Sequence, residues 1–568
     1  MFDFIAGFRH SIQSGIIRKC ACSSLAFTGL ILLLVPGLSG CPRHRGPVAS
    51  FTAAPLSGPA PLDVQFTNTS LAGDAPITAW EWDFGDGETA NEPNPLHRYE
   101  MPGTYTPRLR IVTRYGQDTF IANEPIVAEG VCTEPGNDES EGPLIEIPDP
   151  LSGDNPRFPL QTAALPVPGQ IIVDAELHTS QQRITQTLSL RHEYSRHDPF
   201  NADQSLIVLT YFPEGDWRVY RTDCVPYDSP ENYVATLNLA EPRWDPQDAN
   251  ILWAIRDLAL VAVDVRDPET AVVVKDFTQD PVTSPFLQSN PDIYCITMAD
   301  EGEPSQDMRY WAFLMRGTRD DYRFRAMLTW DRDQDLVIAI RILSAAESDI
   351  DWVGMSPKGT YALIGGLDPN GGNLAGLTMA TRDLSQFHRL DFTTAHADVG
   401  LDSDGNEVVV MQNNRTDFID LIPIDWATQP ILETGGSYSG TNRVPLVRLY
   451  YAGDPLGLNS GVHISCNYPG YAVVSTNTEP GLAEQNWLDR KIVLVSLDRA
   501  HPRAFYLAQV HGTHGGYWEE TQASITRDGR KIVWATNWNR NVGHDPELVW
   551  DMLLSLPADW PLTLLPSR

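Results

Sequence analysis

A repeated turn-and-strand pattern dominates the chain from about residue 185 onward. In each copy, a short polar turn leads into a run of apolar residues long enough for one β-strand. Helical periodicity is almost absent from the same region. The copies recur at intervals of roughly 45 to 60 residues, a spacing that predicts one supersecondary unit per repeat. They occupy residues 201 to 211, 245 to 255, 305 to 315, 356 to 366, 402 to 412, 467 to 477 and 526 to 537.

These repeats predict sheets that bury their faces against one another. One four-stranded sheet cannot bury both of its faces alone, whereas a ring of sheets buries each face against a neighbour. At 568 residues the chain is also too long for a single core. We therefore predict an all-β protein in which residues 185–568 form a seven-bladed β-propeller. A stack of unrelated β-sandwiches is the alternative that the pattern leaves open.

Two of the turns carry a family resemblance. SPKG (356 to 359) and TRDG (526 to 529) are similar to the Ser-Pro-Asp-Gly turn that precedes an apolar strand in propellers of the Tol translocation protein B type and in related WD-like propellers. The resemblance covers most of residues 185 to 560. It implies the fold and leaves the function open, because propellers perform many activities.

Residues 48–129 break into short alternating runs that predict a separate antiparallel β-sandwich. The stretch WEWDFGDGET (80 to 89) shows why. Trp80, Trp82 and Phe84 are spaced two apart, so they project from one face of a strand. The aspartates and glycines that follow are residues that form tight turns.

This module resembles the PKD (polycystic kidney disease) domain. The matching pieces are PLDVQFTNTS (61 to 70), WEWDFGDGET (80 to 89), HRY (97 to 99) and PGTYTPRLRIV (102 to 112). The resemblance implies a spacer, or a contact module for proteins and carbohydrates, in an extracellular protein. It brings no catalytic residues, so we interpret the aspartates as turn-forming.

The N-terminus has the pattern of a secretion signal. Basic residues precede an apolar run at 25 to 37, too short for a comfortable permanent span, and LSGC follows at 38 to 41. This ending resembles the lipobox of bacterial lipoproteins. It implies a signal peptide over 1–40, a lipid on Cys41 and a lipidated tether over 41–47; an ordinary secretory signal is the alternative.

The resemblance also implies a location. Pro42 follows the cysteine where lipoproteins kept at the inner membrane of Gram-negative bacteria have Asp. We therefore expect a lipid-anchored protein of the bacterial cell envelope, at the outer membrane or the cell surface, with the membrane as one of its partners.

Composition narrows the remaining choices. The 74 Asp and Glu residues outnumber the 41 Lys and Arg, and no basic stripe interrupts them, which argues against nucleic acid as a partner. Residues 130–184 are acidic and rich in proline, so we interpret them as a linker. Cys132, Cys224, Cys295 and Cys466 show no zinc-ligand spacing, and the sequence leaves disulfides and free thiols open.

A candidate site follows from the predicted propeller, whose ligands gather at one mouth of the central channel. Imidazoles that converge there could hold a divalent metal, and neighbouring polar side chains could complete the site. Surface or core histidines are the alternative. The candidate metal ligands are His396, His463, His511, His514 and Gln522, and Asp398 is a candidate binding residue.

This region has a faint resemblance to oligogalacturonate lyases, which are seven-bladed propellers that bind a divalent metal through axial His and Gln residues. In that family the glutamine is followed closely by two histidines. Here Gln522 is followed by Ala523, Ser524 and Ile525. Only Gln522 matches by position, which weakens the case for metal-assisted lyase chemistry.

We therefore interpret the chain as a cell-envelope lipoprotein that uses a PKD spacer and a propeller to bind a glycan or a protein partner without catalysis, and we assign no cofactor firmly. The alternative is a metal-dependent, lyase-like enzyme acting on polysaccharide. The sequence does not identify the ligand, the disulfide pairing or the oligomeric state.

Overall fold

The computed structural model describes residues 44–129, 143–160, 163–319, 322–367, 374–394, 396–428, 442–451, 454–457, 461–478, 486–513, 517–539 and 549–564. The predictions for the signal peptide, Cys41, Cys132 and His514 lie outside these residues. Within them the chain forms forty β-strands and only two short α-helices, α1 (Thr283–Ser289) and α2 (Trp560–Thr563). The all-β prediction is confirmed.

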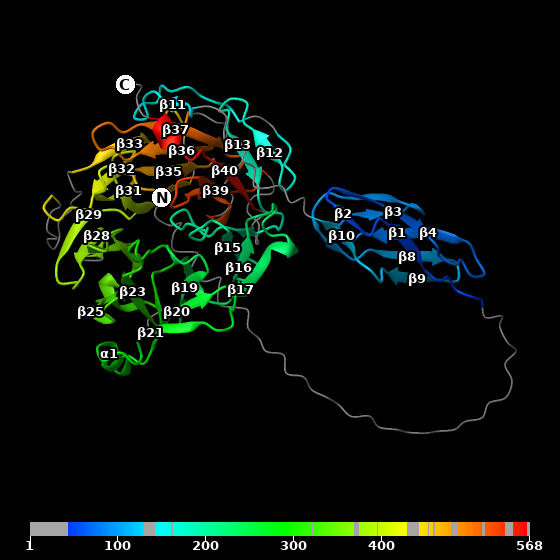
Figure 1. Ribbon diagram of the computed structural model, residues 1–568, viewed down its shortest axis with the longest axis horizontal. Coiled ribbons are helices and arrows are strands. Elements are labelled where there is room, and N and C mark those ends of the chain that lie inside the picture. The colour runs from blue at the N-terminus through cyan, green and yellow to red at the C-terminus, as the bar shows by residue number, and fades with distance from the viewer. Residues whose placement is uncertain are drawn as a thin grey trace, which may run out of the picture.

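The N-terminal body is a β-sandwich (Figure 1). Its strands belong to three small sheets in the orders β1-β3-β6, β2-β10-β7 and β5-β4-β8-β9. The strands are β1 (Phe51–Ala54), β2 (Ser57–Pro59), β3 (Leu62–Asn68), β4 (Ile77–Asp83), β5 (Thr89–Ala90), β6 (Leu96–Tyr99), β7 (Gly103–Tyr105), β8 (Arg108–Thr113), β9 (Gly116–Ile121) and β10 (Ile126–Glu129).

The core of this sandwich contains the aromatic residues that the sequence singled out. Trp82 and Phe84 are 1% and 2% exposed, and Trp80 is half-buried against the same cluster. The turn after β4 uses Asp83, whose Oδ1 accepts from the Gly85 N–H at 2.9 Å. Gly85 has a φ of 88°, a backbone conformation that favours glycine. The turn-forming interpretation of Asp83 therefore holds.

The larger body consists of seven sheets, which we number 1 to 7. Sheet 1 contains β14 (Leu190–Arg191), β15 (Leu206–Tyr211), β16 (Asp216–Arg221) and β17 (Tyr233–Leu237). Sheet 2 contains β18 (Ala240–Trp244), β19 (Ile251–Arg256), β20 (Ala259–Asp264) and β21 (Val272–Asp276). Sheet 3 contains β22 (Ile293–Thr297), β23 (Tyr310–Gly317), β24 (Phe324–Asp331) and β25 (Leu336–Ile342).

Sheet 4 contains β26 (Ile350–Met355), β27 (Tyr361–Gly366), β28 (Gly376–Thr381) and β29 (Phe387–Asp391). Sheet 5 contains β30 (Ala397–Leu401), β31 (Glu407–Asn413), β32 (Phe418–Pro423) and β33 (Val444–Arg448). Sheet 6 contains β34 (Val462–Ser465), β35 (Tyr471–Thr476), β36 (Lys491–Ser496), β37 (Ala504–Gln509) and β11 (Glu146–Ile147). Sheet 7 contains β38 (Ser524–Ile525), β39 (Lys531–Thr536), β40 (Trp550–Ser555), β13 (Ser180–Arg183) and β12 (Ile171–Val173).

All seven predicted turn-and-strand copies occupy the same place in their sheets. They form the second strands β15, β19, β23, β27, β31, β35 and β39. Alternate residues of these strands face opposite neighbours. In β35, for example, Val473 packs toward sheet 7 and Val474 packs toward sheet 5. The repeat therefore reflects one sheet per copy, buried on both faces.

Hydrophobic clusters join the sheets in a cyclic order. Separate clusters fill the contacts between sheets 1 and 2, 2 and 3, 3 and 4, 4 and 5, 5 and 6, and 6 and 7. A further cluster joins sheet 7 to sheet 1 through Val533 and Leu553 on one side and Ile207 and Leu209 on the other. In Figure 1 the sheets follow one another around the body in chain order, in a propeller-like arrangement.

The segment predicted as a linker contributes three strands to the last two sheets. β11 pairs with β37, β12 pairs with β13, and β13 pairs with β40. Ile147 of β11 is buried in the cluster between sheets 5 and 6. The acidic and proline-rich composition concealed these short strands, which pair with backbone groups that would otherwise form open sheet edges.

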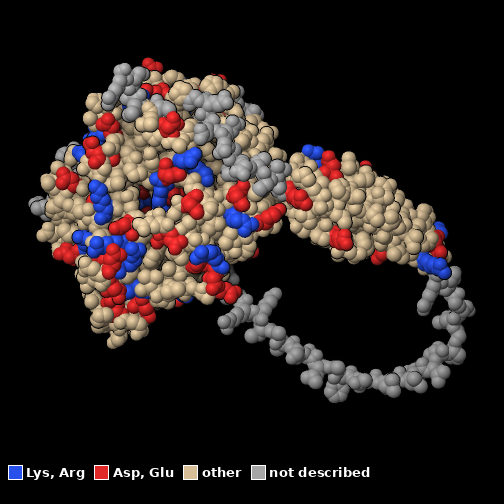
Figure 2. Space-filling model, viewed as in Figure 1, with Lys and Arg blue, Asp and Glu red and all other residues tan. Residues whose placement is uncertain are grey.

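The described cysteines fall into two classes. Cys224 is disulfide-bonded, whereas Cys295 and Cys466 are free thiols. On the face drawn in Figure 2, acidic and basic side chains are interspersed. Within the described part of the chain, no helix is long and apolar enough to cross a bilayer.

Candidate functional site

One irregular segment connects the seven sheets at their centre. Residues 192–198, here called the central segment, follow β14 and precede β15. Their side chains reach all six of the other sheets or the turns of those sheets. The contacts are His192 with Asp551; Tyr194 with His396 and His463; Arg196 with Glu301 and Trp352; His197 with Arg243 and Glu303; and Asp198 with the Arg527 backbone.

A buried charge cluster fixes one part of this segment. Arg243 lies 3.2 Å from Glu193 Oε2 and 2.6 Å from Glu303 Oε1. The Arg243 Nη2 also donates to His197 Nε2 at 2.6 Å, so the proton of His197 lies on Nδ1, which donates to Glu193 at 2.7 Å. Burial and the Arg243 charge lower the pKa of His197 well below its usual value, which agrees with a neutral ring. Burial raises the pKa of Glu193 to about 7, although Arg243 opposes the shift.

Arg196 is held on two sides. Its Nη2 lies 3.1 Å from Glu301 Oε2, and its guanidinium lies over the Trp352 ring at 4.4 Å from the ring centre. Burial opposes the charge of Arg196, but Glu301 and other acidic neighbours outweigh that effect and raise its pKa. Burial raises the pKa of Glu301 to about 7 against the opposing effect of Arg196.

Asp398 lies beside Arg196 and is fixed by the backbone. Its Oδ2 accepts from the Cys466 N–H at 2.6 Å and its Oδ1 from the Val399 N–H at 2.8 Å. Burial raises the pKa of Asp398 to about 7, because it outweighs the opposing effects of Arg196 and of these two hydrogen bonds.

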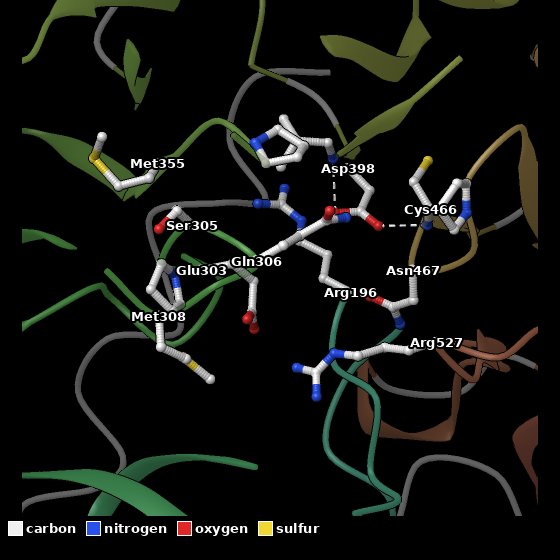
Figure 3. A pocket seen from close by; sticks show the side chains of 14 residues that line it. Arg196, Glu303, Ser305, Gln306, Met308, Met355, Asp398, Cys466, Asn467 and Arg527 are labelled. Carbon is white, nitrogen blue, oxygen red and sulfur yellow. Dashed lines mark hydrogen bonds between the residues drawn. The ribbon is translucent and has the colours of Figure 1, made fainter. Parts of the chain in front are cut away.

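A cavity of about 190 Å³ opens beside these charged groups (Figure 3). It is lined mainly by the turns between the first and second strands of sheets 3, 4, 6 and 7, together with the central segment and β30. Its polar side chains include Arg196, Glu303, Asp398, Asn467 and Arg527. Figure 3 shows the Arg196 and Asp398 side chains close together, with the Arg527 guanidinium entering from another element.

Apolar groups complete the cavity wall. Met308 and Met355 contribute flexible side chains, and the turn residues Pro304, Pro357 and Pro469 contribute rigid ones. The cavity therefore combines charged and amide groups with an apolar wall, a combination typical of small-ligand sites.

A histidine pair lies on the side of Tyr194. The rings of His396 and His463 are 4.5 Å apart between centres. Tyr194 OH lies 3.2 Å from His396 Nδ1, and Glu520 forms a hydrogen bond with His463 Nε2. Burial, followed by His463, lowers the pKa of His396 to about 3, so the ring is neutral at pH 7.

The predicted metal ligands come together only in part. His396 and His463 approach each other, but His511 stacks on Trp538 at 4.1 Å between ring centres. The Gln522 Oε1 accepts from Arg191 at 2.8 Å. Among the residues that the structure describes, no group of three or more His, Cys, Asp or Glu side chains is placed to hold a metal. Glu520 occupies His463 Nε2 and Tyr194 faces His396 Nδ1, whereas His463 Nδ1 is buried without a hydrogen-bond partner.

The sequence predictions found two of the groups described above and missed most of the others. Asp398 lies in the cavity wall, and His396 and His463 face the central segment. The missed residues are Tyr194, Arg196, Glu303, Glu520 and Arg527. One signal was present: HEYSRHD (192 to 198) places six ionisable side chains in seven positions just before an apolar strand.

Comparisons with known proteins place one part of the chain in a family. The family model described as "PKD domain" matches residues 44–124. A curated relative, collagenase ColQ1 of Bacillus cereus (strain Q1), is 32% identical over 114 residues, which are 20% of this chain. The chain spans only 12% of the length of that relative.

Several solved structures are similar to parts of this chain. An oligogalacturonate lyase in complex with manganese gives a TM-score of 0.45 at 12% identity, covering 69% of this chain and 96% of its own. The oligogalacturonate lyase from Vibrio parahaemolyticus gives 0.44 at 11% identity, covering 69% and 97%. The PKD1 domain of the Vibrio cholerae metalloprotease PrtV is 31% identical over 15% of this chain and 99% of its own, with a TM-score of 0.13. The family match and the core around Trp82 together show that residues 44–124 of this chain are a PKD domain.

Proposed function

We propose that the larger body is a closed seven-bladed β-propeller. Three observations support the proposal: the seven sheets, the cyclic order of the clusters between them, and the pairing of β13 with β40, which joins the start of this body to its end. The contacts of the central segment with all the other sheets agree with a common axis.

We further propose that the protein binds a glycan at the central cavity and does not convert it chemically. The single observation that carries this proposal is the cavity itself, because its polar groups are already fixed before any ligand enters. Arg196 is held by Glu301 and Trp352, and Asp398 by two backbone donors. Pre-organised polar groups beside an apolar wall suit a ligand that offers both hydroxyl groups and C–H faces.

The cellular setting is part of the same proposal. A lipid on Cys41 would hold the protein in the cell envelope, and the PKD domain would separate the propeller from the membrane. The small cavity suits one residue or one substituent of a larger ligand. A protein partner that inserts a single side chain is the alternative ligand.

A polysaccharide-active enzyme is the second candidate, and one observation favours it. Glu301 and Asp398 have pKa values raised to about 7, which is the range suited to general acid–base catalysis near neutral pH. Against it, His396 is neutral at pH 7 and burial raises the pKa of Tyr194 well above its usual value, so this hydrogen-bonded pair is poorly suited to exchange protons.

The test separates the two functions. The soluble protein is titrated calorimetrically with a panel of neutral and acidic oligosaccharides, and each mixture is analysed for new reducing ends and unsaturated products. We expect binding without products, and weaker binding by Arg527→Ala, whose side chain lines the cavity. Product formation that disappears in Asp398→Asn would establish the enzyme, and a panel without any binding would reject glycan recognition.

A further inference from the structure

One tryptophan differs from all the others in its packing. The structure describes every tryptophan of the chain, and each except Trp518 belongs to, or packs against, one of eight hydrophobic clusters. Trp518 lies in the 3₁₀ turn Tyr517–Glu519, which precedes β38, and its side chain is half-buried. A large aromatic ring outside the core, with part of its surface open to solvent, is a feature of binding sites.

Two further aromatic rings adjoin Trp518. Phe212, in the turn after β15, has its ring centre 4.7 Å from that of Trp518, with an angle of 42° between the planes. Tyr517 meets Trp518 edge to face at 5.0 Å. Phe212 and Tyr517 are also half-buried, and neither belongs to any of the eight clusters. We call these three residues the aromatic step.

Hydrogen bonds from a buried arginine fix the turn that carries Trp518. The fully buried Arg191 donates from Nη1 to the Trp518 carbonyl at 2.6 Å and from Nη2 to Gln522 Oε1 at 2.8 Å. A guanidinium that makes both bonds fixes the turn that carries the indole. A ring that is already fixed loses little conformational entropy when a ligand stacks on it.

Hydrogen-bonding groups lie beside the aromatic step. The Tyr517 ring is 6.1 Å from that of His463. Burial raises the pKa of Tyr517, and the charges of Glu301, Glu520 and Asp351 contribute to that shift, which places these carboxyl groups in its neighbourhood. Carboxyl groups therefore lie on the Tyr517 side of the aromatic step, where Glu301 pairs with Arg196 and Glu520 bonds to His463.

We propose that Trp518 and Phe212 form a stacking subsite for a pyranose ring of a glycan. A pyranose has a flat C–H face that packs on the electron-rich face of an aromatic ring. This inference rests on the proposed glycan recognition and adds a second contact point on the side of Tyr194 and the histidine pair, at the opposite ends of the first strands from the turns that line the cavity. It also gives a reason for a tryptophan at position 518, where packing in a hydrophobic cluster does not account for one.

The test compares variants of the full soluble chain. Calorimetric titration with the oligosaccharides bound by the wild type should show that Trp518→Ala weakens binding about tenfold, equivalent to about 1.4 kcal/mol. Trp518→Phe, which keeps a smaller aromatic ring, should lose less. Tyr294→Ala, which removes an exposed aromatic ring on β22 outside the aromatic step, should bind as the wild type does.

A second measurement does not depend on the alanine variant folding. Saturating glycan should change the tryptophan emission of the wild type, and this change should be absent in Trp518→Phe. A wild type that binds no glycan would reject the proposed function. The stacking subsite alone would be overturned if the wild type binds glycan and both Trp518→Ala and Trp518→Phe bind it as tightly as the wild type and keep the emission change. If Trp518→Ala loses binding to a protein ligand and keeps its binding to glycan, the subsite recognises a protein partner instead of a glycan.

Discussion

The Arg196 guanidinium lies 4.4 Å from the centre of the Trp352 ring, and both side chains are buried. Arg196 comes from the connection between β14 and β15, and Trp352 from β26, so this contact joins sheet 1 to sheet 4 across the centre of the body. The same guanidinium forms an ion pair with Glu301 near sheet 3. One side chain therefore holds three distant parts of the chain together.

Replacing Arg196 by methionine should destabilise the protein strongly. The variant removes the buried guanidinium that pairs with the half-buried Glu301, and losing one partner of a buried ion pair costs up to about 3–5 kcal/mol. Urea denaturation followed by tryptophan fluorescence measures the change. The matched control is Arg157→Met, an exposed arginine whose loss should change stability by less than about 0.5 kcal/mol. Equal effects of the two variants would contradict the proposed role of Arg196.

The raised pKa of Asp398 predicts a particular pH dependence. Its folded pKa of about 7 lies above the value of the unfolded chain, so between about pH 4 and 7 the folded state binds more protons than the unfolded state. Stability from this group is therefore complete at low pH and is lost as the pH rises through 7. The free energy of unfolding of the wild type, measured relative to Asp398→Asn, should fall across this range.

Asp383 provides a control of opposite sign. Hydrogen bonds from Thr381 and Ser385 lower the pKa of this exposed carboxyl group. Its contribution is therefore present above the unfolded pKa and is lost as the pH falls. The wild type measured against Asp383→Asn should gain stability as the pH rises through the acidic range. Parallel profiles for the two aspartates would refute the assignment for Asp398.

Strand β13 should be essential for the last sheet. Gln182 pairs with Leu553 of β40 on one side and with Ile171 of β12 on the other. Gln182→Pro removes a backbone donor from the interior of the sheet and should lower the free energy of unfolding by about 3 kcal/mol or more. Val173→Pro alters the outermost strand β12, where the side chain is 62% exposed, and should cost less. Thermal unfolding of both variants measures these losses of stability. A larger loss of stability in Val173→Pro than in Gln182→Pro would contradict the pairing of β13 with β40.

The proposed lipid anchor on Cys41 predicts a simple fractionation result. Full-length protein expressed in a Gram-negative host should appear in the membrane fraction and incorporate labelled fatty acid, because acyl chains supply about 0.8 kcal/mol of membrane affinity per buried methylene. Cys41→Ala should be soluble and unlabelled. Labelling that persists in this variant would place the anchor elsewhere, whereas a soluble wild type would indicate an ordinary secretory signal.

Local patterns made much of the architecture predictable. The seven second strands were identified because a turn rich in Asp, Gly and Pro and an apolar run are both visible within about ten residues. The turn after β4 was predictable for the same reason, since Asp83 and Gly85 act on their own neighbours. The strands β11 to β13 were missed because their partners β37 and β40 lie far along the chain, and no local pattern identifies such pairing.

The site was less predictable for a related reason. His396 and His463 were expected near a common axis and do approach each other, since both lie at the start of a first strand. His511 follows a fourth strand instead, and there it stacks on Trp538. The roles of Tyr194 and Arg196 depend on contacts with residues more than one hundred positions away, which spacing in the sequence does not reveal.

The pairing of β13 with β40 also sets the order in which the protein can mature. Sheet 7 contains strands from both ends of the larger body. It can therefore be completed only after β40 has emerged during synthesis or export. Until then β13 has no β40 to pair with, and the inner faces of sheets 1 and 6 lack their common neighbour. A chain cut short before β40 would therefore expose apolar surface at two places and become a target for chaperones and proteases of the compartment in which it folds.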